Sequence, residues 1–364
     1  MIRRTLLKLG MLSGAVAASG LAAPAIAQGK RTLKMVTTWP KNFPGLGTGA
    51  QRLADSIGEM TDGQIDVTLY AAGELVPAFE SYDAVSSGTA DMYHGADYYW
   101  QGKHKGFNFF TSVPFGMTAD EISAWIQWGG GQELWNELAG RFNVRSYMGG
   151  NTGVQMGGWF RKEINSLDDM QGLKIRMPGL GGEVLRRIGA AAVAMPGGEI
   201  FPAMQSGAID ASEWVGPWND LAFGFYKVAK YYYYPGFHEP GSVLSCGMNL
   251  DVFNSLSKAH QAVFQAACHQ ETNRMLAEFN RNNGDALATL INEHGVELRR
   301  VPNEVLTTIG EISGQVVHEV SQEDDLGKEI YESFITNRRN SIGWSRLSEE
   351  SYFSARRLPF PYEQ

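Results

Sequence analysis

The sequence is poor in the features that mark several protein classes. Only two of its 364 residues are cysteines, Cys246 and Cys268, which excludes a disulfide-rich scaffold and leaves open whether the two pair. Beyond the amino-terminal segment no run reaches the roughly 18 apolar residues that a membrane span needs, so we expect a soluble mature protein. The formal net charge of −8 at pH 7 argues against nucleic acid as a partner.

Catalytic signatures are also missing. The chain has no Gly-x-Ser-x-Gly elbow, His-Glu-x-x-His helix, Cys-x-x-Cys pair or Walker loop. Its seven histidines are scattered, and none stands at helical spacing from a second histidine or from a cysteine. We therefore predict a protein that binds a ligand without converting it and is not an enzyme. An enzyme exported in the folded state stays open as an alternative from another class.

The first 27 residues are predicted to be an export signal. Arg3, Arg4 and Lys8 precede a weakly apolar stretch that ends in Ala25-Ile26-Ala27, a cleavage pattern. Adjacent arginines before such a stretch are typical of twin-arginine export, with an ordinary secretory signal as the alternative. The mature chain is then expected to begin near Gln28 and to work in the periplasm.

The mature chain alternates strand patterns with helix patterns, which is typical of an α/β architecture. About 337 residues exceed what one hydrophobic core usually organises, so we predict two α/β domains. The predicted strands include 33–37, 65–69, 155–160 and 174–177, and the predicted helices include 50–60, 183–188 and 201–206.

A single long helix is predicted from Lys258 to His294. Ser257 can cap its start, Gly295 can end it, and apolar residues recur at helical spacing between them. At 1.5 Å per residue such a helix is on the order of 55 Å long, so we expect it to cross between the two domains. The alternative is two shorter helices that break near 282–284.

One arginine stands in an apolar strand pattern within "LKIRMPGLGGEVLRRIG", residues 173–189. Arg176 is followed by a glycine-rich segment, which raises the question of a nucleotide-phosphate loop. The third glycine of a dinucleotide fingerprint is missing at Val184, and Glu183 would place a negative charge beside the phosphate. We therefore favour a cation that captures a small anion over a phosphate loop. A structural arginine paired with Asp168 or Asp169 remains open.

Other polar residues on predicted strand ends and loops are flanked by aromatic residues, a composition typical of a closed pocket for a small solute. The polar residues and their aromatic neighbours are Tyr98, Tyr99, Trp100, Gln155, Glu213, Trp214, Trp218, Asn219, His238 and Glu239.

Residues 30–364 resemble a solute receptor of the tripartite ATP-independent periplasmic (TRAP) transporters. The motifs that carry the resemblance are "LKMVTTWP", "DMYHGADYYWQGK", "LKIRMPGLGGEVLRRIGA", "EIFPAMQSGAIDASEW" and "SARRLPFP". They are similar to the DctP-like family, and most of all to its 2-oxoacid-binding TakP type. The resemblance implies a two-lobed α/β periplasmic solute-binding protein fold, with a long helix spanning both lobes.

The resemblance also implies the division of the chain. Lobe I is expected to comprise residues 28–150 plus about 240–278, and lobe II residues 151–239 plus about 279–325. Residues 326–364 are expected to form a helical tail with an apolar stripe at Ile330, Phe334 and Trp344 that one lobe does not cover. Since TakP-type receptors exchange such a helix between subunits, we predict a homodimer, with a helix folded back on its own lobe as the alternative.

The expected solute is a small 2-oxo or 2-hydroxy monocarboxylate, delivered to a membrane permease. By resemblance, Arg176 forms a bidentate pair with the solute carboxylate, for which its planar guanidinium is suited. A cation, Na⁺ or Ca²⁺, is expected to bind the side-chain oxygen of Gln155, the carboxylate of Glu213 and the backbone carbonyl of Trp214, with Glu239 as a further member.

Two more residues complete the predicted pocket. Tyr98 is expected to contribute a phenol from lobe I, ahead of Tyr99, and Asn219 to line the site. A larger organic acid, a sugar acid or a dicarboxylate remains an alternative solute, and the sequence does not decide between the two cations.

Overall fold

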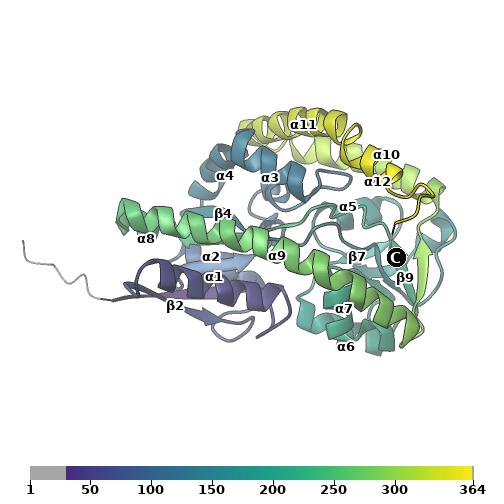
Figure 1. Cartoon of the computed structure of the whole chain (residues 1–364), viewed down its shortest axis with the longest axis horizontal. Coiled ribbons are helices and arrows are strands. Elements are labelled where there is room, and N and C mark those ends of the chain that lie inside the picture. The colour runs from purple at the N-terminus through teal and green to yellow at the C-terminus, as the bar shows by residue number, and fades with distance from the viewer. Residues whose placement is uncertain (1–29, 363–364) are drawn as a thin grey trace, which may run out of the picture.

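The computed structural model describes residues 30–362, so the predicted export signal lies outside the described residues. The chain forms two mixed β-sheets with helices packed around each (Figure 1). We call the elements around the first sheet lobe I and those around the second sheet lobe II. Within the described residues, no helix combines the length and the apolarity that crossing a bilayer requires.

The sheet of lobe I has five strands, with β10 antiparallel to both of its neighbours and the other pairs parallel. Their spatial order is β2 (Ile65–Tyr70), β1 (Arg31–Thr37), β3 (Met92–Gly95), β10 (Val243–Asn249) and β4 (Val144–Asn151). The helices of this part of the chain are α1 (Leu46–Met60), α2 (Ser81–Ser86), α3 (Ala119–Trp128), α4 (Gly131–Gly140) and α8 (Leu250–Ser255).

The sheet of lobe II has six strands, in the order β11 (Glu297–Arg300), β9 (Tyr231–Tyr234), β5 (Gly158–Phe160), β8 (Ala211–Ser212), β6 (Lys174–Arg176) and β7 (Ala191–Val193). Strand β5 is antiparallel to β9 and β8, and the remaining pairs are parallel. Its helices are α5 (Gly179–Arg187), α6 (Gly197–Ser206), α7 (Pro217–Phe223) and α10 (Asn303–Val320).

The predicted long helix is present as α9, Lys258–Asn292, and the alternative of two helices broken near 282–284 is wrong. The Ser257 hydroxyl caps it by accepting the His260 N–H, and Gly295 follows its end with φ +65°. Helix α9 packs on α1 and β4 of lobe I and on α7 of lobe II, so it spans both lobes (Figure 1).

Aromatic side chains join the two lobes in one apolar cluster. Trp39 and Phe43, from the loop after β1, pack edge-on against Trp214 of lobe II at ring separations of 6.1 and 6.2 Å. Phe43 also lies 4.3 Å from the Phe223 ring. Since Trp39, Phe43 and Trp214 are buried, packing at this contact excludes water and holds the lobes together.

Two predicted boundaries were wrong. Gln155 precedes its strand, which begins only at Gly158, where φ is +117°. The helix predicted from residue 183 begins earlier, at Gly179, because the glycine-rich segment after Arg176 forms the first turn of α5. A Cβ on Gly182 would lie 2.2 Å from the Met177 carbonyl oxygen, so the glycines serve close packing of the helix.

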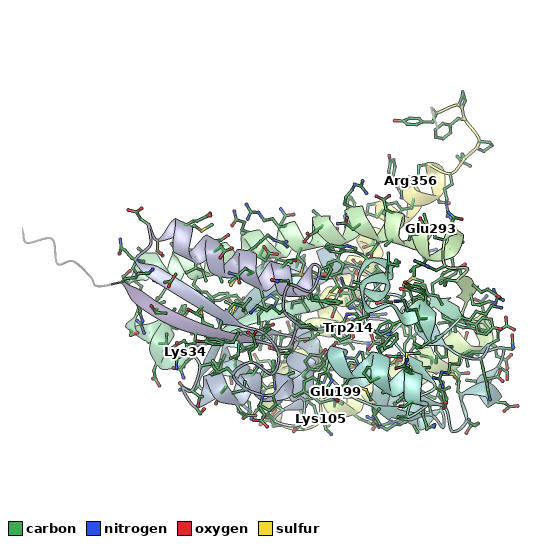
Figure 2. All side chains as sticks on the ribbon, turned by 90° about the horizontal axis from the view of Figure 1, so that it is seen from below. Lys34, Lys105, Glu199, Trp214, Glu293 and Arg356 are labelled. Atoms are coloured by element: carbon green, nitrogen blue, oxygen red, sulfur yellow. The ribbon has the colours of Figure 1, made fainter. Side chains whose placement is uncertain are left out.

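The tail forms α11 (Asp325–Ser345) and α12 (Glu349–Ala355). The expectation that one lobe leaves its apolar stripe uncovered was wrong for Ile330 and Phe334, which are buried because α11 packs on α3 and α4 of lobe I. It was right for Trp344, which is 69% exposed. Beyond Arg356 the chain projects from the body (Figure 2).

Cys246 on β10 and Cys268 on α9 are both fully buried in the apolar cluster between sheet and helix, and no disulfide joins them. Burial raises the pKa of the Cys268 thiol well above its usual value. Cys268 is thus a buried thiol, as its helical spacing from Phe264 predicts.

Candidate functional site

Four loops meet at one edge of the lobe II sheet. Arg176 is the last residue of β6, and Glu213 directly follows the parallel neighbour β8. Strand β9 runs parallel to β8, and the chain after it carries His238 and Glu239. Gln155 enters the same edge because it precedes the antiparallel strand β5. The carboxyl ends of parallel strands are a usual place for ligand sites in α/β proteins.

Two of these loops are fixed to each other through their backbones. Gly236 donates its N–H to the Gln155 carbonyl at 3.0 Å, and Gln155 donates its own N–H to the Glu239 carbonyl at 3.1 Å. A Cβ on Gly236 would lie 2.4 Å from the Gln155 carbonyl oxygen, so this close approach requires glycine. Gln155 and Glu239 are held in place by main-chain contacts rather than by side-chain packing alone.

Arg176 is 1% exposed, and each nitrogen of its guanidinium donates a hydrogen bond. It donates from Nη1 to a side-chain oxygen and the backbone carbonyl of Glu213, from Nε to the Met195 carbonyl at 3.2 Å, and from Nη2 to the Tyr99 hydroxyl at 3.4 Å. The guanidinium also lies 5.2 Å from the Trp214 ring. The alternative of a structural pair with Asp168 or Asp169 is therefore wrong.

The charge of Arg176 is secure despite its burial. Burial alone would lower the pKa of the guanidinium, but the adjacent Glu213 carboxylate more than offsets this and raises it. Arg176 is thus a permanent cation in a dry environment, where a partner anion is held strongly.

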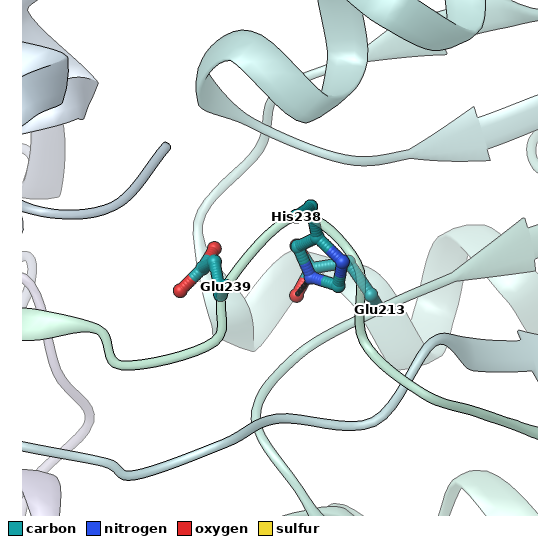
Figure 3. Close-up of side chains that lie close together, drawn as sticks. All are labelled: Glu213, His238 and Glu239. Carbon is teal, nitrogen blue, oxygen red and sulfur yellow. Dashed lines mark ion pairs between the residues drawn. The ribbon is translucent and has the colours of Figure 1, made fainter. Parts of the chain in front are cut away.

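Three buried acidic and imidazole groups gather beside this pair. Ligand atoms of Glu213, His238 and Glu239 all lie within 4.8 Å of one another (Figure 3). His238 Nε2 is 3.2 Å from Glu213 Oε2. Burial would lower the pKa of His238, but Glu213 raises it above its usual value; burial and then Glu213 raise the pKa of Glu239 to about 7.

Buried side-chain oxygens of Gln155, Glu213 and Glu239 in the same cluster fit a hard cation. Gln155 donates from Nε2 to Glu239 Oε2 at 2.8 Å and to the Thr152 hydroxyl at 3.1 Å, which leaves its Oε1 free to act as an acceptor. Within residues 30–362, no hydrogen-bond donor satisfies Gln155 Oε1 or Glu239 Oε1, and Glu213 Oε2 has only His238 Nε2 near it, at 3.2 Å. Buried oxygens without donors are costly unless a cation or ligand binds them, so these residues suit Na⁺ or Ca²⁺.

Two of the aromatic residues, Trp214 and Tyr98, pack beside the site, and a third, Tyr99, contacts Arg176. Trp214 is buried against Trp39 and Phe43, and its indole N–H finds no acceptor within the described residues. Tyr98 is also buried and packs at 4.8 Å against the ring of Tyr99. The hydroxyl that reaches Arg176 belongs to Tyr99, which sequence reasoning ranked below Tyr98.

Asn219 is not brought to Arg176 by any contact in the described residues. Its side-chain amide donates instead to the Pro44 carbonyl of lobe I at 3.0 Å, so it links the lobes. His238 was noted in the sequence among polar residues but given no role. The one sequence signal for His238 is that it directly precedes Glu239. Its approach to Glu213 could not be predicted, because the two residues are far apart in the sequence.

Comparison with known proteins gives consistent results. Residues 35–324 match the DctP family, described as bacterial extracellular solute-binding protein, family 7. The chain is 42% identical over 319 residues to a monocarboxylate 2-oxoacid-binding periplasmic protein of Nostoc sp., which covers 88% of this chain and 87% of that protein.

Solved structures of TRAP solute-binding proteins are similar over most of the chain. One from Pseudoalteromonas atlantica, with bound sodium and pyruvate, has a TM-score of 0.87 at 38% identity, covering 89% of this chain and 99% of that one. One from Colwellia psychrerythraea, with calcium and pyruvate, has a TM-score of 0.86 at 38% identity, covering 90% and 99%. A Bordetella bronchiseptica protein scores 0.88 at 37% identity, covering 90% and 97%; it is a mixed-occupancy dimer with calcium and picolinate in one site.

Proposed function

This chain belongs to the DctP family of bacterial extracellular solute-binding proteins, and we propose that it is a TRAP receptor for a small 2-oxo or 2-hydroxy monocarboxylate bound together with Na⁺ or Ca²⁺. The observation that carries the proposal is the buried Arg176 guanidinium beside the buried oxygens of Gln155, Glu213 and Glu239, of which Gln155 Oε1 and Glu239 Oε1 lack a donor within the described residues. The guanidinium can bind a carboxylate, and the buried oxygens can bind a hard cation. The pyruvate complexes of similar proteins support the same solute class.

Each group has a definite task in this proposal. Arg176 holds the solute carboxylate, while Gln155, Glu213, Glu239 and the backbone carbonyl of Trp214 hold the cation. A bound cation supplies positive charge that offsets the buried carboxylates. Tyr98 and Tyr99 close the site from lobe I, where the Tyr99 hydroxyl already meets the guanidinium.

The receptor works by a difference in affinity between open and closed states, without making or breaking bonds. Closing the lobes removes water that competes for Arg176, which strengthens the bond to the carboxylate. Contacts such as Asn219 to Pro44 and Phe43 to Phe223 stabilise the closed arrangement. We infer that a membrane permease receives the solute, that the protein acts in the periplasm after removal of residues 1–27, and that the lobes divide near residues 150 and 240.

We also infer a homodimer formed through the tail. Large apolar side chains are exposed along it, among them Trp344, Leu347, Tyr352, Phe353 and Leu358. An apolar groove at the base of the tail is lined by Val113, Phe115, Gly310, Gly314, Tyr331 and Phe334. A second copy would cover both, and contiguous exposed apolar surface on a folded protein commonly marks such an interface.

Tryptophan fluorescence tests the receptor function. Ligand-stripped, refolded protein is titrated with pyruvate, longer 2-oxoacids, lactate and succinate, each with and without Na⁺ or Ca²⁺. Because Trp39 and Trp214 lie at the junction of the lobes, closure should change their emission. Saturable quenching by a 2-oxoacid at micromolar concentration is expected. A response to succinate alone would favour a dicarboxylate receptor, and a solute altered after prolonged incubation would favour an enzyme.

A further inference from the structure

The Arg176–Glu213 pair occupies the same guanidinium that the proposed solute requires. Arg176 Nη1 donates to both the side-chain Oε1 and the backbone carbonyl of Glu213, and both residues are almost completely buried. We propose that Glu213 is an exchangeable internal anion: it holds Arg176 when the cation is absent and leaves Arg176 for the cation when the solute binds. This inference rests on the proposed function and adds an obligatory coupling between the two ligands.

The charge balance of the Arg176–Glu213 pair and the two ligands gives the reason. With Arg176 and Glu213 paired, the two charges cancel. A carboxylate that enters alone places two anions on one guanidinium, and a cation that enters alone draws Glu213 away and leaves Arg176 unpaired. Each single event leaves an uncompensated charge in a water-poor site, whereas entry of both ligands forms two matched pairs.

The geometry allows the exchange without moving the backbone. The Glu213 N–H is bonded to the Arg176 carbonyl at 3.2 Å, so the two residues stay adjacent whatever their side chains do. Arg176 keeps two hydrogen bonds during the exchange, from Nε to the Met195 carbonyl and from Nη1 to the Glu213 carbonyl. These two bonds fix the plane of the guanidinium. Only the contact of Nη1 with Glu213 Oε1 has to be replaced by a solute oxygen.

The other oxygen of Glu213 already faces the proposed cation site. Arg176 contacts Oε1, whereas Glu213 Oε2 lies 3.2 Å from His238 Nε2 in the cluster with Glu239 (Figure 3). A small rotation of the carboxylate therefore exchanges one positive partner for another. Because coupling between two ligands is reciprocal, pyruvate must raise the affinity for the cation by the same factor as the cation raises the affinity for pyruvate.

The experiment measures pyruvate affinity by calorimetry in a choline buffer that contains a chelator and no added metal cation, and again with saturating Ca²⁺, for the wild type and for Glu213→Gln. The wild type is expected to bind pyruvate on the order of 100-fold more tightly with Ca²⁺. In Glu213→Gln the competing anion is gone, so binding without Ca²⁺ should be about tenfold tighter than in the wild type, and Ca²⁺ should add almost nothing.

Glu239→Gln is the matched control. It removes a buried carboxylate from the same cluster, but one that makes no hydrogen bond to Arg176, so it should weaken the effect of Ca²⁺ without the tenfold gain in its absence. A second measurement uses only the wild type: Ca²⁺ affinity is determined with and without saturating pyruvate, and the ratio should equal the ratio found for pyruvate. That measurement decides the coupling even where a variant fails to fold.

The outcomes separate this inference from the function on which it rests. Equal pyruvate affinity with and without Ca²⁺ in the wild type would overturn the coupling, while the protein would still be a receptor for a 2-oxoacid. A Glu213→Gln protein that binds no better than wild type in the absence of Ca²⁺ would overturn the exchange. No binding of any 2-oxoacid under either condition would contradict the proposed function itself.

Discussion

Arg176 shows how far single residues can be interpreted before their neighbours are known. An isolated arginine in an apolar strand pattern predicts a buried cation that binds an anion. The structure places Arg176 at the end of β6, where it is buried. Its partner Glu213 is 37 positions away, in a loop after a two-residue strand. No periodicity links such positions, because only the pairing of β6 with β8 brings them together.

Arg176→Lys is expected to weaken pyruvate binding roughly 10- to 100-fold while the protein stays folded. Lysine keeps the positive charge that Glu213 needs, but it loses the planar pair of donors that matches a carboxylate. Fluorescence titration with Ca²⁺ present measures the affinity. Arg186→Lys is the control, because Arg186 lies on α5, half-exposed and paired with Glu183. Equal affinities in all three proteins would show that Arg176 does not hold the solute.

His94 gives a prediction for pH. It accepts the Trp39 indole N–H on Nδ1 at 2.7 Å and lies 3.1 Å from the Gly149 carbonyl through Nε2. Burial, with a smaller contribution from Arg52, lowers the pKa of His94 to about 4 from 6.5. Between these values the unfolded state binds more protons than the native state. The contribution of neutral His94 to the free energy of unfolding is therefore complete above pH 6.5 and is lost as the pH falls towards 4.

His94→Gln should flatten that dependence. Glutamine can accept from Trp39 and donate to the Gly149 carbonyl without titrating. The wild type is expected to lose on the order of 3 kcal/mol of unfolding free energy through His94 between pH 7 and 4, and the variant to lose correspondingly less. Urea unfolding at a series of pH values measures this. Parallel curves for the two proteins would contradict a neutral, buried His94.

Among the elements, the long helix was predicted best and the short strands worst. Helix α9 has a cap, an apolar stripe and a terminating glycine, all local signals. Strands β5, β6 and β8 have two or three residues each, so they carry almost no periodicity, and their place in the sheet is decided by long-range pairing. The start of α5 was missed because its glycines look like a turn until the approach to Met177 is seen.

Gly284→Ala tests the continuity of α9. Gly284 lies inside the helix, is exposed, and has no atom within 4 Å of the place that an added Cβ would take, so alanine should raise the free energy of unfolding by about 0.5 to 1 kcal/mol. Gly295→Ala is the matched control, since it has equal space but φ +65°, and it should destabilise. Thermal unfolding compares the two. A destabilising Gly284→Ala would indicate that the helix bends or breaks there.

For the whole molecule, the resemblance of motifs predicted the two-lobed fold and the family, and the comparisons confirm both. Neither composition nor periodicity could supply the relative position of the lobes. That position depends on Trp39 and Phe43 meeting Trp214, contacts between segments more than a hundred residues apart. The burial of α11 on lobe I was missed for the same reason.

The tail leads to a prediction for assembly. Light scattering after size-exclusion chromatography is expected to give a dimer for the wild type at micromolar concentration, and a monomer for the double variant Trp344→Ser and Phe353→Ser. Both side chains are exposed in the single chain, so the change should not unfold it. Leu75→Ser, which alters an exposed apolar residue outside the tail, is the control and should stay dimeric. A monomeric wild type would contradict the dimer.

The most direct test of the binding site is a crystal structure of the protein with pyruvate and Ca²⁺, using anomalous scattering to locate the calcium. We predict the calcium between Gln155 Oε1, Glu213 and the Trp214 carbonyl, with the pyruvate carboxylate on Arg176 in place of Glu213 Oε1. Calcium and pyruvate bound away from these residues, with Arg176 still paired to Glu213, would contradict the account.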